Sequence, residues 1–289
     1  MKPPQTVLIT GASAGIGAAL ARAYARRGAR LALLARREDR LLALAAELRS
    51  VGVEVSTHAG DVTRDGDVAR AVAELAARQI GVDVVYANAG FGVAGPIQKL
   101  AIADYQRQFD TNVFGVLRTV KETLPALRER RGRLVLIGSV AGYAASGAMS
   151  AYSMSKFAVR ALAETLHVDL LPEGVGVTLV SPGFVDSDIR RTSNQGVVHA
   201  DAPDPIPAWL RLGTDAAARE IIRGVDRGHA EVVVTTHGKL IVFLARHFPG
   251  LLRLAGRKLY RGRPEPALRP PAEAPRPPPT PPPSDAAAP

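Results

Sequence analysis

The 289-residue chain contains no cysteine, which excludes a disulfide framework, a thiolate metal site and a cysteine nucleophile. No segment reaches the roughly 18 uninterrupted apolar residues expected of a membrane-spanning helix. The amino-terminal stretch MKPPQTVLIT also lacks the long apolar run of a secretory signal. These three absences fit a protein of a reducing compartment, and we expect it in the cytoplasm.

Acidic residues are absent from one region, and this absence explains much of the formal net charge of +10. Residues 237–263 hold seven Lys and Arg residues and no Asp or Glu, whereas the first 236 residues carry only about +4. Aromatic residues make up just 5% of the chain and do not alternate with basic ones. We therefore expect no nucleic-acid partner, despite the high isoelectric point.

Short apolar segments alternate with helical ones over the first 236 residues, and 47% of the chain is hydrophobic, enough for a full core. Seven strands are predicted, at 6–10, 30–35, 53–58, 82–87, 133–138, 176–181 and 231–236. Helical periodicity is present at 16–28, 39–50, 66–79 and 104–130. This pattern predicts an α/β fold, a single domain with a doubly wound seven-stranded parallel sheet. Ligands of such sheets bind at the carboxyl ends of the strands, near the switch in strand order.

Three segments depart from this alternation. Residues 184–213 contain three prolines and few periodic apolar residues, so we predict a long loop with short helical pieces. A loop of this length is usually functional, and we interpret it as a substrate lid, with a surface excursion as the alternative. The mixture of cations and apolar residues at 237–263 predicts a basic, amphipathic helical extension that is interrupted at Pro249. Residues 264–289 hold twelve of the 22 prolines, and we predict a disordered tail.

The first predicted strand leads into the sequence TGASAGIG at residues 10–17. Gly11 permits a tight turn, Gly15 lets a pyrophosphate approach the backbone, and Gly17 lets a helix pack closely on the strand. The amino terminus of the following helix offers free N–H donors and a favourable dipole for that phosphate. A glycine turn between a strand and a helix therefore predicts a dinucleotide site, the alternative being an ordinary turn.

The second predicted strand ends in the sequence LALLARRED. Dinucleotide-binding folds often place an acid here, where it binds the ribose hydroxyls of the adenosine. Ala35 occupies that position, and Arg36 and Arg37 follow it. Guanidinium groups can bind a 2′-phosphate that an acid would repel, so we predict NADP(H) rather than NAD as the cofactor. Glu38 and Asp39 fit better in the first turn of the next helix.

These motifs and five later ones resemble those of the short-chain dehydrogenase/reductase family, and the resemblance spans about residues 5–236. The later motifs are GDVT at 60–63, ANAG at 87–90, DTNVFG at 110–115, Ser139 followed 13 residues later by the YxxxK pair, and PGFVDS at 182–187. Ala87 replaces the first Asn of the family's NNAG, and Ser187 stands where the family has Thr. The resemblance implies a Rossmann-type fold and these cofactor-binding residues: Gly11, Ser13, Ala14, Gly15, Ile16, Gly17, Arg36, Arg37, Asp61, Val62, Asn88, Ala89, Gly90, Tyr152, Lys156, Pro182, Gly183, Val185 and Ser187.

The resemblance also implies a catalytic set of Asn112, Ser139, Tyr152 and Lys156. Taken alone, Tyr152 and Lys156 would describe one turn of an ordinary helix. In the family's pattern Tyr152 donates the proton, Ser139 binds the substrate oxygen and Asn112 holds a relay water. Lys156 binds the nicotinamide ribose and, together with the charge of the oxidised nicotinamide, is expected to lower the pKa of Tyr152 from about 10. No metal is implied, since the six His residues show no ligand spacing.

The function that follows is hydride transfer between NADP(H) and a carbonyl or secondary alcohol substrate. Alternatives are a nucleotide-sensing protein without turnover and an epimerase or dehydratase of the same family. Residues 240–260 combine long apolar side chains with cations, a composition that suits an anionic membrane surface. Peripheral membrane contact would favour a lipophilic ketone or aldehyde, and the alternative is packing on protein. The family resemblance also implies a homo-oligomer, a dimer or tetramer.

Overall fold

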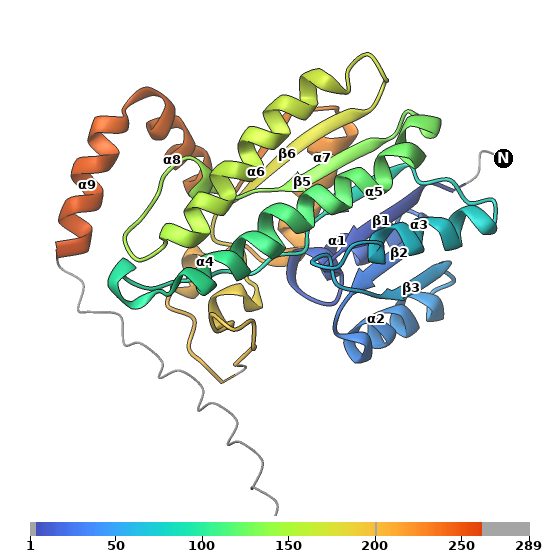
Figure 1. The fold of residues 1–289 in the computed structure, drawn as a ribbon, viewed down its shortest axis with the longest axis horizontal. Coiled ribbons are helices and arrows are strands. Elements are labelled where there is room, and N and C mark those ends of the chain that lie inside the picture. The colour runs from blue at the N-terminus through green and yellow to red at the C-terminus, as the bar shows by residue number, and fades with distance from the viewer. Residues whose placement is uncertain (1–3, 200, 262–289) are drawn as a thin grey trace, which may run out of the picture.

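The computed structural model describes residues 4–199 and 201–261. Its centre is one parallel sheet with the strand order β3-β2-β1-β4-β5-β6-β7 (Figure 1). The strands are β1 (Thr6–Thr10), β2 (Arg30–Ala35), β3 (Val55–Ala59), β4 (Val84–Ala87), β5 (Arg133–Ile137), β6 (Gly176–Pro182) and β7 (Glu231–Val234). The predicted seven-stranded parallel sheet is confirmed, although several strands begin or end one or two residues from the predicted bounds.

Helices cover both faces of the sheet, as the near-continuous apolar strands require. They are α1 (Gly15–Ala25), α2 (Glu38–Ser50), α3 (Asp67–Ala77), α4 (Ile102–Phe109), α5 (Gly115–Arg130), α6 (Ser150–Asp169), α7 (Thr214–Asp226), α8 (Thr236–His247) and α9 (Pro249–Arg261). Apolar side chains of α1, α2 and α7 form one buried cluster, and those of α3, α5 and α6 form another. Glu38 and Asp39 lie in the first turn of α2, as predicted.

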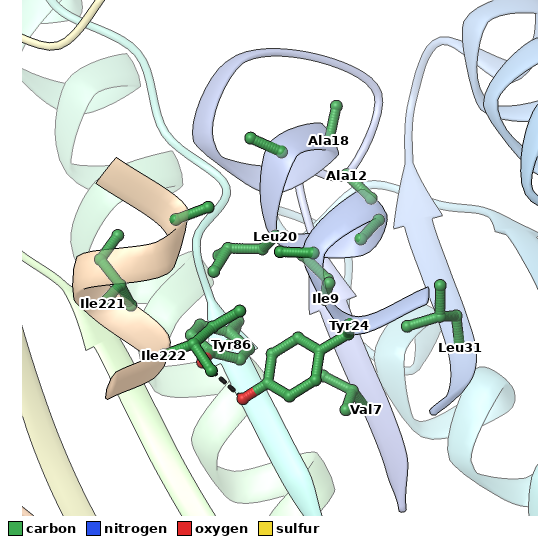
Figure 2. Close-up of a cluster of buried hydrophobic side chains, with 14 of the residues drawn as sticks. Val7, Ile9, Ala12, Ala18, Leu20, Tyr24, Leu31, Tyr86, Ile221 and Ile222 are labelled. Carbon is green, nitrogen blue, oxygen red and sulfur yellow. Dashed lines mark hydrogen bonds between the residues drawn. The ribbon is translucent and has the colours of Figure 1, made fainter. Parts of the chain in front are cut away.

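Two tyrosines tie the first buried cluster together at the centre of the sheet. Tyr24 from α1 and Tyr86 from β4 point toward each other, beside Ile222 of α7 (Figure 2). Their hydroxyl oxygens lie 2.9 Å apart, so each buried phenol has a hydrogen-bonding partner. Burial raises the pKa of both tyrosines, that of Tyr24 to about 12, and both therefore stay neutral. Their role is structural, and they lie apart from the site described below.

The strand order reverses between β1 and β4, and this reversal determines where a ligand can bind. The chain builds outward from β1 to β3 and then returns to the other side of β1 with β4. The crossovers leading away from β1 and β4 therefore diverge and leave a crevice at their carboxyl ends. Thr10 and Ala87, the last residues of these two strands, mark this crevice.

The predicted helix over 104–130 is wrong as a single helix. The structure has α4, then a π-helical segment at Asp110–Phe114, then α5. A π-turn inserts an extra residue into the hydrogen-bond ladder and re-aims the side chains within it, and such turns are frequent at functional sites. Asn112 lies at its centre and is completely buried.

The chain continues from the last strand directly into two carboxyl-terminal helices. β7 ends at Val234, and Thr235 turns the chain with a φ of +82°, in a sparsely populated backbone region that costs about 1–3 kcal/mol. Its hydroxyl accepts a hydrogen bond from the N–H of Gly238 and so caps α8. Val242 of α8 is buried in the second cluster, and α9 packs against α8. None of the helices among the described residues is long and apolar enough to cross a membrane. The predicted disordered tail lies outside these residues.

Candidate active site

Tyr152 and Lys156 lie one turn apart near the amino terminus of α6. The Nζ atom of Lys156 is 5.8 Å from the ring centroid of Tyr152 and donates a hydrogen bond of 2.9 Å to the carbonyl oxygen of Ile137, where β5 ends. Lys156 is only 5% exposed, and this burial lowers its pKa to about 8. The ammonium group is thus held at the edge of the sheet, under the face of the phenol.

Ser139 follows β5 and faces the same phenol. Its Oγ atom accepts a hydrogen bond of 3.1 Å from the N–H of Ala141, which leaves the hydroxyl proton free to donate. Burial raises the pKa of Tyr152, while the nearby hydroxyl of Ser139 and the positive charge of Arg190 act in the opposite direction. In the protein without cofactor, desolvation of the phenolate dominates. The lowering predicted for Lys156 together with the oxidised nicotinamide stays a prediction.

Asn112 reaches the same region from the π-helical segment, but its side chain is already engaged. Its Oδ1 atom accepts from the N–H of Phe91 at 3.1 Å, and its Nδ2 atom donates to the carbonyl oxygen of Phe91 at 3.0 Å. A Cβ atom on Gly90 would lie 3.1 Å from Oδ1 of Asn112 and 3.8 Å from Nζ of Lys156. The side chain of Asn112 thus fixes the loop after β4 beside Lys156. The relay water stays a prediction.

The glycine turn lies at the crevice between β1 and β4. Gly11 has a φ of +66°, and a Cβ atom there would lie 2.7 Å from Cα of Ala89. Asn88 clamps the turn, since its Nδ2 atom donates to the carbonyl oxygens of Thr10, at 2.8 Å, and Gly11, at 3.2 Å. A Cβ atom on Gly17 would lie 2.5 Å from the oxygen of Gly11. Three segments can approach this closely only because glycine stands at both positions.

The cations after β2 reach this turn. Arg37 donates to Oγ of Ser13, with 3.2 Å between Nη2 and Oγ, and so bridges the end of β2 and the glycine turn. Arg36 is largely exposed, and its Nη1 atom lies 3.7 Å from Oδ2 of Asp61. No acidic residue lies in the first turn of α1. The open helix amino terminus and the two guanidinium groups fit an anionic ligand with a phosphate near Ser13.

The segment after β6 closes the crevice from the other side. The Cβ atom of Ser187 lies 3.5 Å from the position that a Cβ of Gly15 would take, so Ser187 faces the glycine turn. A cleft of about 480 Å³ lies between them, and its lining includes Ser13, Ser187 and Asp188. Gly183 is required for a different reason, because a Cβ there would lie 2.3 Å from Oγ1 of Thr235.

Comparison with known proteins agrees with this geometry. Residues 5–197 match the family model described as short chain dehydrogenase. This chain belongs to the short-chain dehydrogenase family. A relative from Sesamum indicum named 11-beta-hydroxysteroid dehydrogenase A is 32% identical over 267 residues, covering 90% of this chain and 76% of that protein.

Two solved structures show how far the similarity extends in space. A short-chain dehydrogenase from Sphingobium yanoikuyae in complex with NADPH is 30% identical, with a TM-score of 0.69 over 92% of this chain and 98% of that one. A short-chain dehydrogenase/reductase from Burkholderia phymatum in complex with NAD is 25% identical, with a TM-score of 0.73 over the same 92% and 98%. Members of the family thus bind either cofactor, and the comparisons leave the choice open for this chain.

Most of the residues that the family resemblance implied lie together at this edge of the sheet, with two qualifications. Val62 is 4% exposed, and its side chain packs where Gly115 leaves room, so only its backbone can face a ligand. Asp61 accepts from the N–H of Thr63 at 2.9 Å and lies beside Arg36, so its carboxylate is already partnered. Ala14 caps α1 with extended backbone, and Ile16 packs on the first core cluster.

Sequence reasoning missed a group of residues that support the segment after β6. The Nε2 atom of His237 accepts a hydrogen bond of 2.9 Å from the N–H of Phe184, and the two rings stack with centroids 5.0 Å apart. Burial lowers the pKa of His237, which keeps the ring neutral and able to accept. Arg190 and Asp204 of the predicted lid were missed as well. A lone His or a charged pair in a loop carries no periodic signal, so only the folded structure reveals these contacts.

Proposed function

We propose that this short-chain dehydrogenase transfers a hydride between NADP(H) and a carbonyl or secondary alcohol substrate. One observation carries the proposal: a partly buried phenol, near the hydroxyl of Ser139 and one turn from Lys156, lies at the same sheet edge as the glycine turn. NADPH, when bound, supplies the hydride. The protein then has to deliver a proton to the substrate oxygen. It also has to stabilise that oxygen as negative charge develops on it.

The chain's own groups can carry out these two tasks. Tyr152 is protonated at neutral pH, because burial raises the pKa of its phenol, and it can therefore act as the acid in carbonyl reduction. The Oγ atom of Ser139 accepts a hydrogen bond from the N–H of Ala141. Its hydroxyl proton can therefore be donated to the substrate oxygen. Lys156 is positioned for the ribose hydroxyls of the nicotinamide. Asn112 holds the loop at Phe91 and, through it, the wall of the site.

The preference for NADP(H) rests on the end of β2. Position 35 holds Ala in place of the acid that would repel a 2′-phosphate. Arg37 lies beside Ser13, and Arg36 lies beside Asp61. The relative crystallised with NADPH supports this choice by analogy, and the one crystallised with NAD shows that the family alone does not decide it. The cofactor proposal therefore depends on these arginines.

The substrate is proposed to be a lipophilic ketone or aldehyde. Support comes from the relative named as a hydroxysteroid dehydrogenase and from exposed apolar side chains near the carboxyl terminus. We call the latter the α8–α9 apolar surface, which consists of Leu240, Phe243, Phe248, Leu251 and Leu254, each more than half exposed. This surface suits peripheral contact with a membrane. Residues 184–213 are proposed as the lid over the substrate.

Homo-oligomerisation is proposed on a separate surface. Met154, Phe157, Val168 and Leu171, on and just after α6, are each more than 40% exposed, and such a row of large apolar residues is typical of a protein interface. Light scattering of the purified protein would show a dimer or tetramer, and a monomer at all concentrations would contradict the proposal.

A panel of carbonyl compounds tests the proposed function. Purified protein is mixed with NADPH and with steroid ketones, long-chain aldehydes and small polar ketones, and NADPH consumption is followed by its absorbance. We expect turnover that favours the apolar members of the panel. Tight NADPH binding without turnover of any carbonyl would instead favour the nucleotide-sensing alternative.

A further inference from the structure

One carboxylate joins three parts of the segment 184–213. Asp204 receives a two-pronged contact from Arg190, with 2.8 Å between Nε and Oδ1 and 2.7 Å between Nη2 and Oδ2. The two side chains are only 18% and 8% exposed. Paired, parallel hydrogen bonds between a guanidinium and a carboxylate are the strongest and most directional ion pairs that proteins form. This segment is therefore built around a specific contact, unlike an ordinary surface loop.

Asp204 makes further bonds to both sides of this contact. Its Oδ1 atom accepts from the N–H of Ile206 at 2.9 Å, and its Oδ2 atom lies 3.2 Å from Nη1 of Arg211. The same Nη1 atom donates to Oδ1 of Asp186 at 2.9 Å. These bonds, with that of Arg190 first among them, lower the pKa of Asp204 to about 2, so the carboxylate stays charged at any physiological pH.

Arg190 connects this cluster to the candidate active site. Its Nη2 atom also donates to the carbonyl oxygen of Val185, at 3.0 Å, in the segment expected to bind the cofactor. The neighbouring Ile189 and the ring of Tyr152 both border Gly92, at 3.7 and 3.6 Å from the position of a Cβ atom there. Two cations thus lie near the phenol of Tyr152, Lys156 on its own helix and Arg190 from the lid.

We propose that Arg190 is a positioning residue of the reaction: Asp204 fixes its guanidinium, which holds the Val185 segment in place and keeps a positive charge near Tyr152. The inference rests on the proposed function and adds to it a residue outside the family's pattern. Arginine suits this role better than lysine, because one planar group must bond a carboxylate and a carbonyl at once. The order of the lid is thereby coupled to the electrostatics of the proton donor.

Three variants separate the two parts of this role. Arg190→Gln removes both the positive charge and the two-pronged contact with Asp204, whereas Arg190→Lys keeps only the charge. Asp204→Asn keeps the cation at Arg190 but weakens the ion pair that holds it. Asp201→Asn, an exposed acid of the same segment, and Arg219→Gln, an exposed arginine of α7, are the matched controls. For each variant, kcat, KM, the affinity for NADPH, the pH dependence of kcat and the midpoint of thermal unfolding are measured.

The expected results differ between variants. Misplacement of the Val185 segment should lower kcat/KM roughly 10- to 100-fold in Arg190→Gln, Arg190→Lys and Asp204→Asn, with both controls near wild type. Loss of the cation raises the pKa of Tyr152, so the pH at which carbonyl reduction declines should move upward in Arg190→Gln. Arg190→Lys should restore that pH profile without restoring kcat/KM.

Two results would overturn the inference. One is kcat/KM and a pH profile equal to wild type in both Arg190 variants. The other is a loss of activity that follows the unfolding midpoint while the pH profile of Arg190→Gln stays that of wild type, since this would leave Arg190 a merely structural role. The proposed function fails separately, if wild-type protein reduces no carbonyl. In that case the ionisation of Tyr152 is followed by tyrosinate absorbance against Tyr152→Phe, and an unchanged ionisation in Arg190→Gln would overturn the inference.

Discussion

The ammonium group of Lys156 is 2.9 Å from the carbonyl oxygen of Ile137, and this hydrogen bond ties helix α6 to the end of strand β5. It brings the two halves of the candidate site together, since β5 leads directly into Ser139 and α6 carries Tyr152. The same contact buries a cation, and burial has an energetic consequence that can be measured.

Burial of Lys156 should make the stability of the protein depend on pH in the alkaline range. Its pKa is about 8 in the folded protein and near 10.5 when the chain is unfolded. Between these values the unfolded chain binds more protons, so the free energy of unfolding rises with pH. Relative to Lys156→Met, wild type should gain about 2–3 kcal/mol between pH 7 and pH 10. Urea unfolding of both proteins at the two pH values measures this gain. An equal change in the free energy of unfolding of wild type and Lys156→Met between these pH values would contradict it.

Tyr152→Phe should abolish turnover while leaving NADPH binding intact. The change removes only the proton donor, and loss of a general acid typically costs about 10²–10⁴-fold in rate. Steady-state kinetics and a fluorescence titration with NADPH measure the two quantities. Tyr24→Phe is the control, because it also removes one phenol hydroxyl but only breaks the contact with Tyr86. It should lower stability by about 1–3 kcal/mol, because the buried hydroxyl of Tyr86 loses its partner, and should spare activity. Near-normal reduction rates in Tyr152→Phe would end the proposed mechanism.

The sheet and the positions of the motifs could be predicted because each depends on local sequence. Apolar strands buried on both faces leave a clear pattern, and the glycine turn is constrained by close backbone approach at Gly11 and Gly17. The division of the predicted helix over 104–130 could not be foreseen. A π-turn at Asp110–Phe114 keeps the helical periodicity on either side of it and shifts the register only locally.

Electrostatics was the least predictable part. The sequence points to two charges that act on Tyr152, those of Lys156 and of the oxidised nicotinamide, but it does not show that burial raises the pKa of the phenol in the folded protein without cofactor. Desolvation depends on how the whole chain packs, and no motif encodes it. The contacts of Arg190 with Asp204 and of His237 with Phe184 likewise join residues 14 and 53 positions apart. Such pairs become visible only when the fold brings them together.

Replacing both Arg36 and Arg37 by Ala should weaken NADPH binding roughly 100-fold or more and leave NADH binding nearly unchanged. Each guanidinium can form charge-assisted bonds to a 2′-phosphate, and NADH has no such group. Calorimetric titration with both cofactors gives the ratio of their dissociation constants. Arg26→Ala, at the exposed end of α1, is the control for loss of positive charge. Equal affinity of wild type for NADPH and NADH would remove the role assigned to these arginines.

Gly183→Ala should destabilise the protein by about 2 kcal/mol or more and lower activity. The new methyl group would lie 2.3 Å from Oγ1 of Thr235 and 2.6 Å from Nε2 of His237, so the contact that holds Phe184 has to open. Overpacking of a well-packed site costs about 1–3 kcal/mol. Gly256→Ala adds the same methyl group in open space within α9 and should be neutral or slightly stabilising. Thermal unfolding compares the two, and equal midpoints would contradict the close packing described at Gly183.

Binding to anionic vesicles tests the role of the α8–α9 apolar surface. Lys239 and Arg246 pair with Glu220 and Glu231, whereas the exposed Arg253 and Arg257 are available for lipid head groups. Each basic side chain near such a surface contributes about 1 kcal/mol, and inserted apolar side chains add to it. Sedimentation with phosphatidylserine vesicles at low salt should recover the protein, and phosphatidylcholine vesicles should not. Replacing Leu251 and Leu254 by Ser should abolish recovery, whereas the matched change of exposed Ile97 and Ile102 to Ser, remote from this surface in sequence, should leave it intact. If the wild-type protein binds neither kind of vesicle, the membrane proposal is excluded. Packing on another protein would then be the role of this surface.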